Sequence, residues 1–405
     1  MRPVFLALAA VLVAAGCSVP APPPEAPRGF VFYQAEHGIT VADGRGTVLS
    51  GDATVASADW STLYAVRGSE LVTFDPGTNR TLATAPVPSG FTATAVSVDG
   101  DLVALTEGAK ADRPVGKSAT RIIVADPTGK RPAKELTLAG NFEPEAFSSG
   151  GDFLFVLEYL PANAPERYRV RRVVLDSGEV QPLLLRDKRV VPAGAEEEMR
   201  GEGRQAVLAP DRNRLYTLYL HQGDHQHTRD LIAGRHAPDG RPVHAFVHVL
   251  SLTEGWAYCL DLPDPFGLHP AGTHALTISP DGRTLHVVET ETGQIAVADT
   301  ESLTITRVTP VPGEPSGAGD AALSFAPAGD ALYLSAGNLV RRLDSSTLRV
   351  DATWPQPAPV HGLAVSPDGR RVLIGQKDHI AWIDVVSGRT AGTVAAAGLI
   401  RLRHA

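Results

Sequence analysis

Cysteine is scarce in this chain, since Cys17 and Cys259 are the only two among 405 residues. A disulfide framework is therefore excluded, and so is haem attachment through Cys-x-x-Cys-His, which needs two neighbouring cysteines. Cys259 lies in the apolar run Trp256–Leu262, which has the pattern of a strand. We expect it to be a buried structural thiol, with the stability of the fold supplied by side-chain packing.

An excess of basic residues is also missing. The chain has 37 Lys and Arg against 45 Asp and Glu, which gives a net charge of −8 and a pI near 5.9. Binding to phosphate backbones needs a basic surface, so nucleic acid is excluded as a partner. The sequence also lacks the Gly-x-Ser-x-Gly motif of hydrolase nucleophiles and any glycine-rich phosphate-binding loop. No motif therefore indicates an enzyme of these classes.

The N-terminus has the features of an export signal. Arg2 precedes the apolar run Val4–Val13, which has signal-peptide length and is too short to span a bilayer. The run ends in Val13-Ala14-Ala15-Gly16-Cys17, and small residues before a cysteine resemble the lipobox at which bacterial lipoproteins are cut and lipidated. This resemblance implies that Cys17 carries a lipid, although Ala14 stands where lipoboxes usually have leucine.

A proline-rich stretch follows Cys17 and predicts an extended spacer, because proline removes backbone hydrogen-bond donors. We therefore divide the chain into a signal peptide (1–16), a tether (17–28) and one folded domain (29–405). The prediction is a monomer outside the cytoplasm, held on the outer face of the bacterial cell membrane by the lipid on Cys17.

An internal repeat predicts the fold. His274–Val288 and His361–Ile374 both consist of a short alternating strand, a Ser-Pro-Asp-Gly turn and a second apolar strand. Proline, aspartate and glycine each favour the turn, so the unit is a β-hairpin. Weaker copies lie at Ala53–Val66, Thr92–Thr106, Glu143–Leu157, Arg204–Leu218 and Ala321–Ser335. Repeated hairpins without a helical period predict an all-β fold, a single β-propeller.

The number of strands predicts how the ring closes. Seven copies supply first and second strands, but eight segments have the pattern of a third strand, generally ending in aspartate. The first of these, Gly38–Asp43, has no inner strand before it, whereas Leu399–His404 follows the last outer strand. We therefore expect the C-terminal strand to complete the N-terminal blade and to give eight blades. Seven blades is the alternative, because Arg401 and Arg403 fit poorly in an inner strand.

The turns Ser279-Pro280-Asp281-Gly282 and Ser366-Pro367-Asp368-Gly369, with the aspartate-ended third strands, resemble the YVTN-type propeller family and its YncE-like members. The resemblance runs from about Phe30 onwards and is strong in the last third of the chain. It implies the fold and leaves the activity open, because members of the family do many different things.

The long insertions fall on the connections that emerge at one face of a propeller, which favours a recognition surface there. The richest insertion carries His221, Asp224, His225, His227 and His236, with His244 and His248 following. Imidazole and carboxylate groups in one segment bind zinc, copper or nickel. The sequence therefore offers a divalent transition metal as a candidate cofactor, with a solvated polar loop or a partner contact as the alternative.

A second set of candidates comes from aligning the repeats. His274 and His361 both lie five residues before the turn serine, where the inner strand enters the channel mouth. The corresponding positions place Asp52, Glu143 and Arg204 in the same ring. Such a ring suits a cation or a small polar ligand. The resemblance favours a structural origin for the two histidines, because YVTN-like repeats often carry histidine at this position.

These observations favour a cell-envelope binding or scaffolding module that holds a protein or a small-molecule ligand. An extracytoplasmic metal-binding propeller is one alternative. A lactonase-like or quinoprotein-like enzyme is another, because such propellers assemble their sites from residues scattered around the channel. No residue is assigned a catalytic role.

Overall fold

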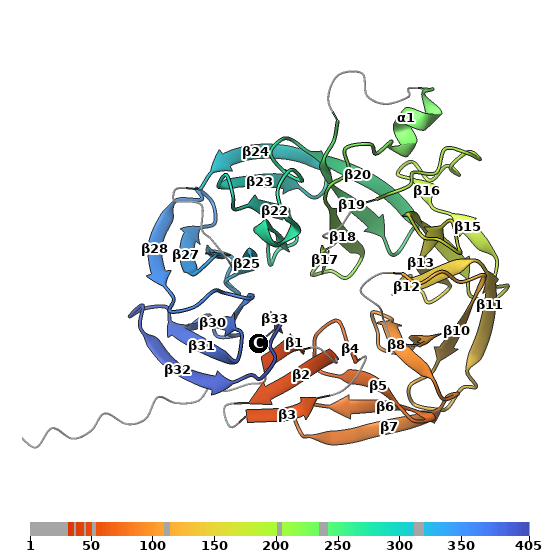
Figure 1. Ribbon diagram of the computed structural model, residues 1–405, viewed down its shortest axis with the longest axis horizontal. Helices are drawn as coiled ribbons and strands as arrows, with labels where there is room; N and C mark the ends of the chain where they lie inside the picture. The colour runs from red at the N-terminus through yellow and green to blue at the C-terminus, as the bar shows by residue number, and fades with distance from the viewer. Residues whose placement is uncertain are drawn as a thin grey trace, which may run out of the picture.

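The computed structural model describes residues 31–35, 38–43, 46–50, 54–108, 114–200, 205–234, 242–311 and 320–404. The predicted signal peptide and tether, with Cys17, Asp52, Arg204 and His236, lie outside the described residues. The described strands form eight sheets arranged as a ring (Figure 1). The prediction of an eight-bladed, all-β propeller is therefore confirmed.

We number the blades in chain order. Blade 1 contains β1 (Val31–Ala35), β2 (Gly38–Asp43), β3 (Gly46–Ser50) and β33 (Arg401–His404). Blade 2 contains β4 (Val55–Ala56), β5 (Leu63–Arg67), β6 (Glu70–Asp75) and β7 (Arg80–Pro86). Blade 3 contains β8 (Phe91–Val96), β9 (Val103–Glu107), β10 (Ala119–Ala125) and β11 (Lys134–Ala139). Blade 4 contains β12 (Asn141–Phe147), β13 (Phe153–Leu160), β14 (Arg167–Val174) and β15 (Val180–Pro182).

Blade 5 differs by having a fifth strand at its outer edge. It contains β17 (Gln205–Leu208), β18 (Arg214–Tyr219), β19 (Ala245–Ser251), β20 (Trp256–Leu262) and the short parallel strand β16 (Leu184–Leu185). Blade 6 contains β21 (His274–Ile278), β22 (Thr284–Glu289), β23 (Gln294–Asp299) and β24 (Thr304–Pro310). Blade 7 contains β25 (Ala322–Phe325), β26 (Ala331–Ala336), β27 (Leu339–Asp344) and β28 (Val350–Pro355). Blade 8 contains β29 (Leu363–Val365), β30 (Arg371–Gln376), β31 (His379–Asp384) and β32 (Thr390–Ala395).

The repeated turns form as the residues dictate. Ser279 Oγ donates to Asp281 Oδ1 at 2.6 Å and accepts the backbone N–H of Thr284 at 3.0 Å. Gly282 follows with a φ of +73°, which glycine adopts without steric cost. Each serine thus links the two strands of its hairpin, and this local network explains why the motif marks a blade.

The ring closes through the two ends of the described chain. In β33, Leu402 is paired with Tyr33 of β1, and Arg401 is paired with Gln34 (Figure 1). Leu402 faces the core, whereas the Arg401 guanidinium donates to the carbonyl of Ala321 at 3.1 Å. The arginines therefore alternate with the core residue and do not prevent β33 from serving as the inner strand of blade 1.

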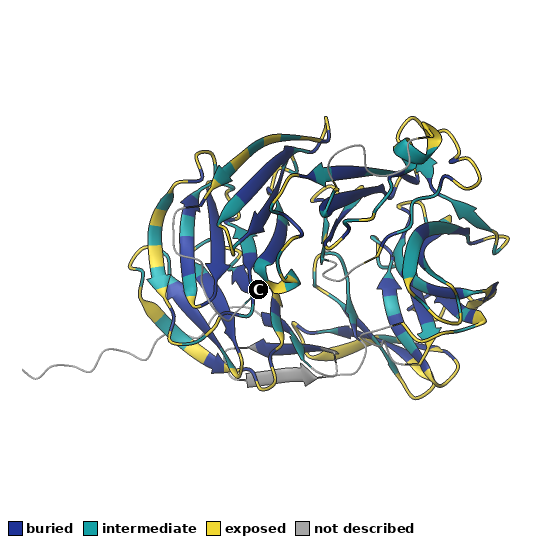
Figure 2. Ribbon diagram, turned by 45° about the horizontal axis from the view of Figure 1, so that its top comes forward, coloured by how far each residue is buried: buried dark blue, intermediate teal, exposed yellow. Residues whose placement is uncertain are grey.

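The apolar core lies between neighbouring blades, where the middle strands are buried, whereas outer strands such as β7 and β24 and the connecting turns are largely exposed (Figure 2). Helical structure in the described residues is confined to α1 (Thr228–Ile232) and a 3-10 turn at Ala271–Thr273. Among the described residues there is no helix with the length and apolar character needed to cross a membrane. The helix α1 lies in the histidine-rich insertion of blade 5, beside the outer strands of that blade (Figure 1).

Candidate metal centre

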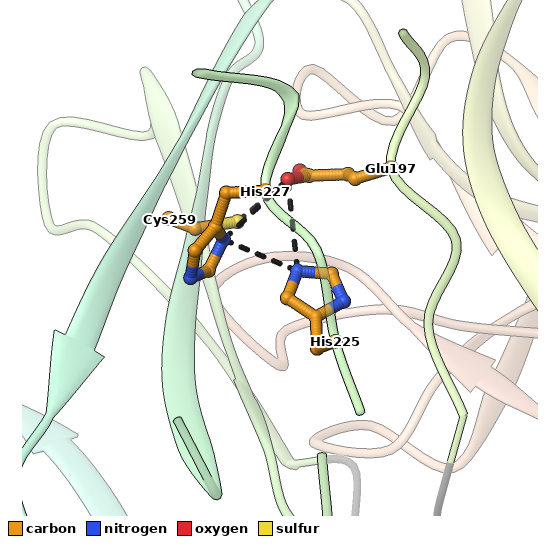
Figure 3. Close-up of side chains that lie close together, drawn as sticks. All are labelled: Glu197, His225, His227 and Cys259. Carbon is orange, nitrogen blue, oxygen red and sulfur yellow. Dashed lines mark hydrogen bonds and ion pairs between the residues drawn. The ribbon is translucent and has the colours of Figure 1, made fainter. Parts of the chain in front are cut away.

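Blade 5 carries a cluster of four side chains whose donor atoms all lie within 4.8 Å of one another: Glu197, His225, His227 and Cys259. Glu197 comes from the connection between β16 and β17, both histidines from the β18–β19 insertion, and Cys259 from β20. Three separate segments therefore meet at one point (Figure 3).

The strand register explains the position of Cys259. Cys259 is the cross-strand partner of His248 in β19, and Phe246 is the partner of Asp261. Because alternate residues of a strand share a face, these four side chains lie on the same side of blade 5. The face thus combines a thiol, an imidazole and a carboxylate beside an apolar aromatic ring.

Glu197 is placed by a short antiparallel pairing with blade 4. The backbones of Tyr168 in β14 and Met199 exchange two hydrogen bonds, of 2.9 and 2.7 Å. Side chains of an extended segment point alternately to its two sides. Glu197 and Met199 therefore face blade 5, whereas Glu196 and Glu198 face the opposite side. Met199 is fully buried against Tyr168 in the core between blades 4 and 5.

The two neighbouring glutamates attach the same segment to a row of arginines on β14. Glu196 lies 3.1 Å from Arg171 and 3.5 Å from Arg169, and Glu198 is paired with Arg167. Glu196 and Glu198 therefore fix the segment by ion pairs with blade 4, and the carboxylate of Glu197 lies in the cluster.

The two histidines are fixed by packing and by their outer ring nitrogens. The imidazole of His225 is fully buried and stacks on Phe246 with ring centres 4.5 Å apart. Its Nδ1 lies 3.2 Å from the backbone carbonyl of Glu198. His227 Nε2 lies 2.7 Å from Asp261 Oδ1. Both rings consequently turn their other nitrogens, His225 Nε2 and His227 Nδ1, towards the cluster.

The inner donor atoms are close together (Figure 3). His225 Nε2 and His227 Nδ1 are 3.1 Å apart, and each lies 3.7 Å from Glu197 Oε2. The Cys259 thiol donates to Glu197 Oε1 at 3.1 Å. His248 Nε2 lies 3.9 Å from the same oxygen. Two ring nitrogens at this separation, facing a carboxylate, require a proton or a metal ion between them.

The pKa values of the cluster follow from burial and mutual attraction. Burial raises the pKa of the Glu197 carboxyl, but hydrogen bonds with His225 and His227 outweigh it and hold the pKa well below its usual range. Burial lowers the pKa of His227, yet Asp261 and Glu197 raise it to about 9. Burial, reinforced by Glu197, raises the pKa of the Cys259 thiol well above its usual range. Without a metal, the cluster therefore keeps a thiol proton and a cationic His227 beside an ionised carboxylate.

Two cavities border the cluster. One, of about 510 Å³, is lined by Glu197, His227 and Cys259 together with apolar side chains of β16 and neighbouring segments. The other, of about 470 Å³, has His221, Asp224 and His225 in its lining. An ion thus has a route to the buried donors.

The structure brings together part of the predicted metal set. His225 and His227 converge, whereas His221 Nε2 lies 2.9 Å from the carbonyl of His269, and Asp224 lines the second cavity without joining the cluster. Cys259, predicted as a buried structural thiol, is buried and also joins the cluster, whereas Glu197 was not among the predicted metal ligands. Two features of the sequence could have indicated them. One is the run of three glutamates at 196–198, and the other is the spacing of Cys259 and Asp261, which places both side chains on one face of a strand.

Three of the predicted channel-mouth residues, Glu143, His274 and His361, contact neighbouring groups in the structure. His274 is fully buried, and its Nε2 accepts the backbone N–H of Gly267 at 3.0 Å, so it fixes the connection before β21. His361 Nδ1 lies 3.1 Å from Asp320 Oδ2. Glu143 accepts the Tyr159 hydroxyl at 2.6 Å in a small pocket.

The chain matches no protein-family model and no curated protein sequence. Solved structures resemble it in fold. The dihydro-heme d1 dehydrogenase NirN in complex with DHE aligns with a TM-score of 0.54 and 13% identity, covering 94% of this chain and 76% of NirN. Apo AztD from Citrobacter koseri aligns with a TM-score of 0.53 and 13% identity, covering 91% of this chain and 95% of AztD. At such identities the likeness shows a shared propeller fold.

Proposed function

We propose that this propeller is a metal-binding protein that holds one divalent transition ion, with Zn²⁺ as the best fit, between Glu197, His225, His227 and Cys259. The observation that carries the proposal is the 3.1 Å approach of His225 Nε2 to His227 Nδ1 in front of an ionised carboxylate. Without a metal, the proton on His227 lies between these two nitrogens, and a bound metal ion would take its place.

The donor set and its spacing suit zinc. Thiolate, imidazole and carboxylate are its common ligands, and a tetrahedral ion with bonds of about 2.0–2.3 Å separates its ligand atoms by roughly 3.3–3.8 Å. The two imidazole nitrogens and Glu197 Oε2 are separated by 3.1 to 3.7 Å, close to this geometry, and all four donors lie within 4.8 Å of one another. Calcium and magnesium prefer oxygen donors, so a site with a thiol and two imidazoles disfavours them.

The surroundings also suit a metal site. Ligating histidines generally have their second ring nitrogen bonded to a carboxylate or a backbone carbonyl, which fixes the ring orientation. His227 faces Asp261 in this way and His225 faces the Glu198 carbonyl. Binding of the ion requires loss of the Cys259 thiol proton and of the proton on His227, so metal uptake releases protons.

Calorimetry on the full chain, stripped with a chelator and titrated with zinc, nickel and copper salts, tests the proposal. We expect one ion per chain with a dissociation constant well below micromolar. Loss of an outer partner of a metal ligand costs about 10- to 100-fold in affinity. Removing a ligand in His227→Ala or Cys259→Ser should therefore weaken zinc binding by more than that.

His221→Ala and Asp224→Ala are the matched controls, because both residues lie in the same insertion outside the cluster. They should leave the zinc affinity within a few-fold of the wild-type value. Cobalt substitution adds an independent readout, since thiolate-to-cobalt absorption should appear and should vanish in Cys259→Ser. Zinc binding no tighter than micromolar, or equal losses in the control variants, would overturn the assignment.

A further inference from the structure

We propose that the 510 Å³ cavity beside the metal cluster is a second binding site, for a small organic anion with an apolar body and one carboxylate-type head group. Its volume falls within the roughly 300–1,000 Å³ range of small-molecule sites. Three of the proposed metal ligands also line the cavity, but the group that selects the ligand, Arg186, is not one of them.

The walls of the cavity are apolar and come from separate segments. Leu183, Leu184 and Val191 line it from the β16 region, Met199 from the segment that carries Glu197, and Ala257 from β20. Ile232, at the end of α1, belongs to the same lining and is 43% exposed. Ile232 therefore extends the apolar lining to the edge of the cavity, where the apolar body of a ligand could contact it.

Most charged groups in the lining already have opposite partners. Arg189 lies 2.6 Å from Asp187, Glu196 lies 3.1 Å from Arg171, and Arg229 is paired with Asp261. Because these charges are neutralised within the protein, the paired groups offer a ligand little unbalanced charge to bind.

Arg186 is the exception. No carboxylate lies within ion-pair distance of it in the part of the chain that the structure describes, and the guanidinium instead donates to the carbonyls of Glu301 and Ser302, at 2.7 and 3.1 Å. The group also lies over the Tyr258 ring, 5.6 Å from its centre. These contacts fix its orientation while using two of its five N–H donors.

A fixed guanidinium with free donors recognises a planar carboxylate, and its charge is unmatched by the protein. The ligand's acid group therefore binds at Arg186, and its apolar body extends between Leu184 and Ile232 towards Met199. Since the same cavity reaches Glu197, His227 and Cys259, a bound ligand also covers the metal cluster from solvent.

Calorimetry with octanoate as the probe tests the site, with octanol and octylammonium as neutral and cationic probes of equal length. The full chain is measured both zinc-loaded and chelator-treated. We expect octanoate to bind at least tenfold tighter than octanol, and octylammonium to bind most weakly. Arg186→Met should abolish the preference for octanoate while octanol still binds, and Ala257→Trp should abolish the binding of both by filling the cavity.

Arg389→Met is the control, because Arg389 is exposed on blade 8, far along the chain from this cavity. It should bind all three probes like the wild type. Zinc calorimetry on the same variants separates the two proposals, because Arg186→Met should retain zinc affinity. Octanoate binding that equals octanol binding, or that survives both Arg186→Met and Ala257→Trp, overturns the carboxylate site whatever the outcome for zinc.

Discussion

Replacing Leu402 by alanine tests the closure of the ring by a single buried side chain. Leu402 is 3% exposed and packs in the cluster that joins blades 1 and 8. The backbone at Gly362 and Gly375 lies close to the Leu402 Cβ, and the rest of the side chain packs among apolar side chains of blades 1 and 8. Truncation to alanine would therefore leave a space inside this cluster.

Truncation of a buried leucine to alanine costs about 2–5 kcal/mol, with the largest losses where the cavity stays open. We therefore expect Leu402→Ala to lower the free energy of unfolding by about 4 kcal/mol. Ile400 is the matched control, because it precedes the same strand and is 53% exposed. Ile400→Ala should cost less than about 0.5 kcal/mol, as substitutions at the surface usually do.

Equilibrium unfolding in urea, followed by tryptophan fluorescence, measures both variants, and Trp382 lies in the same cluster as Leu402. Deletion of residues 399–405 should destabilise the fold more than Leu402→Ala, because it also exposes the inner edge of β1. A loss below about 1 kcal/mol for Leu402→Ala, or equal losses in the two point variants, would refute the closing role of β33.

Three further outcomes are expected. Cys17→Ser should abolish metabolic lipid labelling and leave the chain unprocessed, whereas release of correctly sized wild-type protein without detergent would contradict lipid anchoring. Burial, aided by Arg307, lowers the pKa of His286 to about 4, below the roughly 6.5 of an unfolded histidine. Between pH 6.5 and pH 4 the histidine therefore takes up a proton in the unfolded chain but not in the folded one. The free energy of unfolding should fall by about 3 kcal/mol over this pH range. In urea titrations, His286→Phe should reduce this dependence of stability on pH. Arg171→Met removes a partner of Glu196, which neighbours the ligand Glu197, and should weaken zinc binding by less than the roughly 10- to 100-fold that loss of a ligand's own partner costs, without unfolding the chain, as calorimetry and circular dichroism can show.

The fold could be predicted from the amino-acid sequence, because the signals that specify a blade are local. Ser279, Asp281 and Gly282 form their turn through contacts within a few residues, so the motif has the same meaning wherever it recurs. The surplus third strand at Gly38–Asp43 likewise predicted that the C-terminal strand would close blade 1, which the pairing of Leu402 with Tyr33 confirms.

The metal cluster was only half predictable from sequence. His225 and His227 stand out by their density in one insertion, and they converge. Glu197 and Cys259 are 62 residues apart, and their contact depends on the pairing of Met199 with Tyr168 and on the register between β19 and β20. Which of three adjacent glutamates faces the cluster was decided by that backbone pairing and by the arginines of β14, because a one-residue shift would have turned Glu197 away.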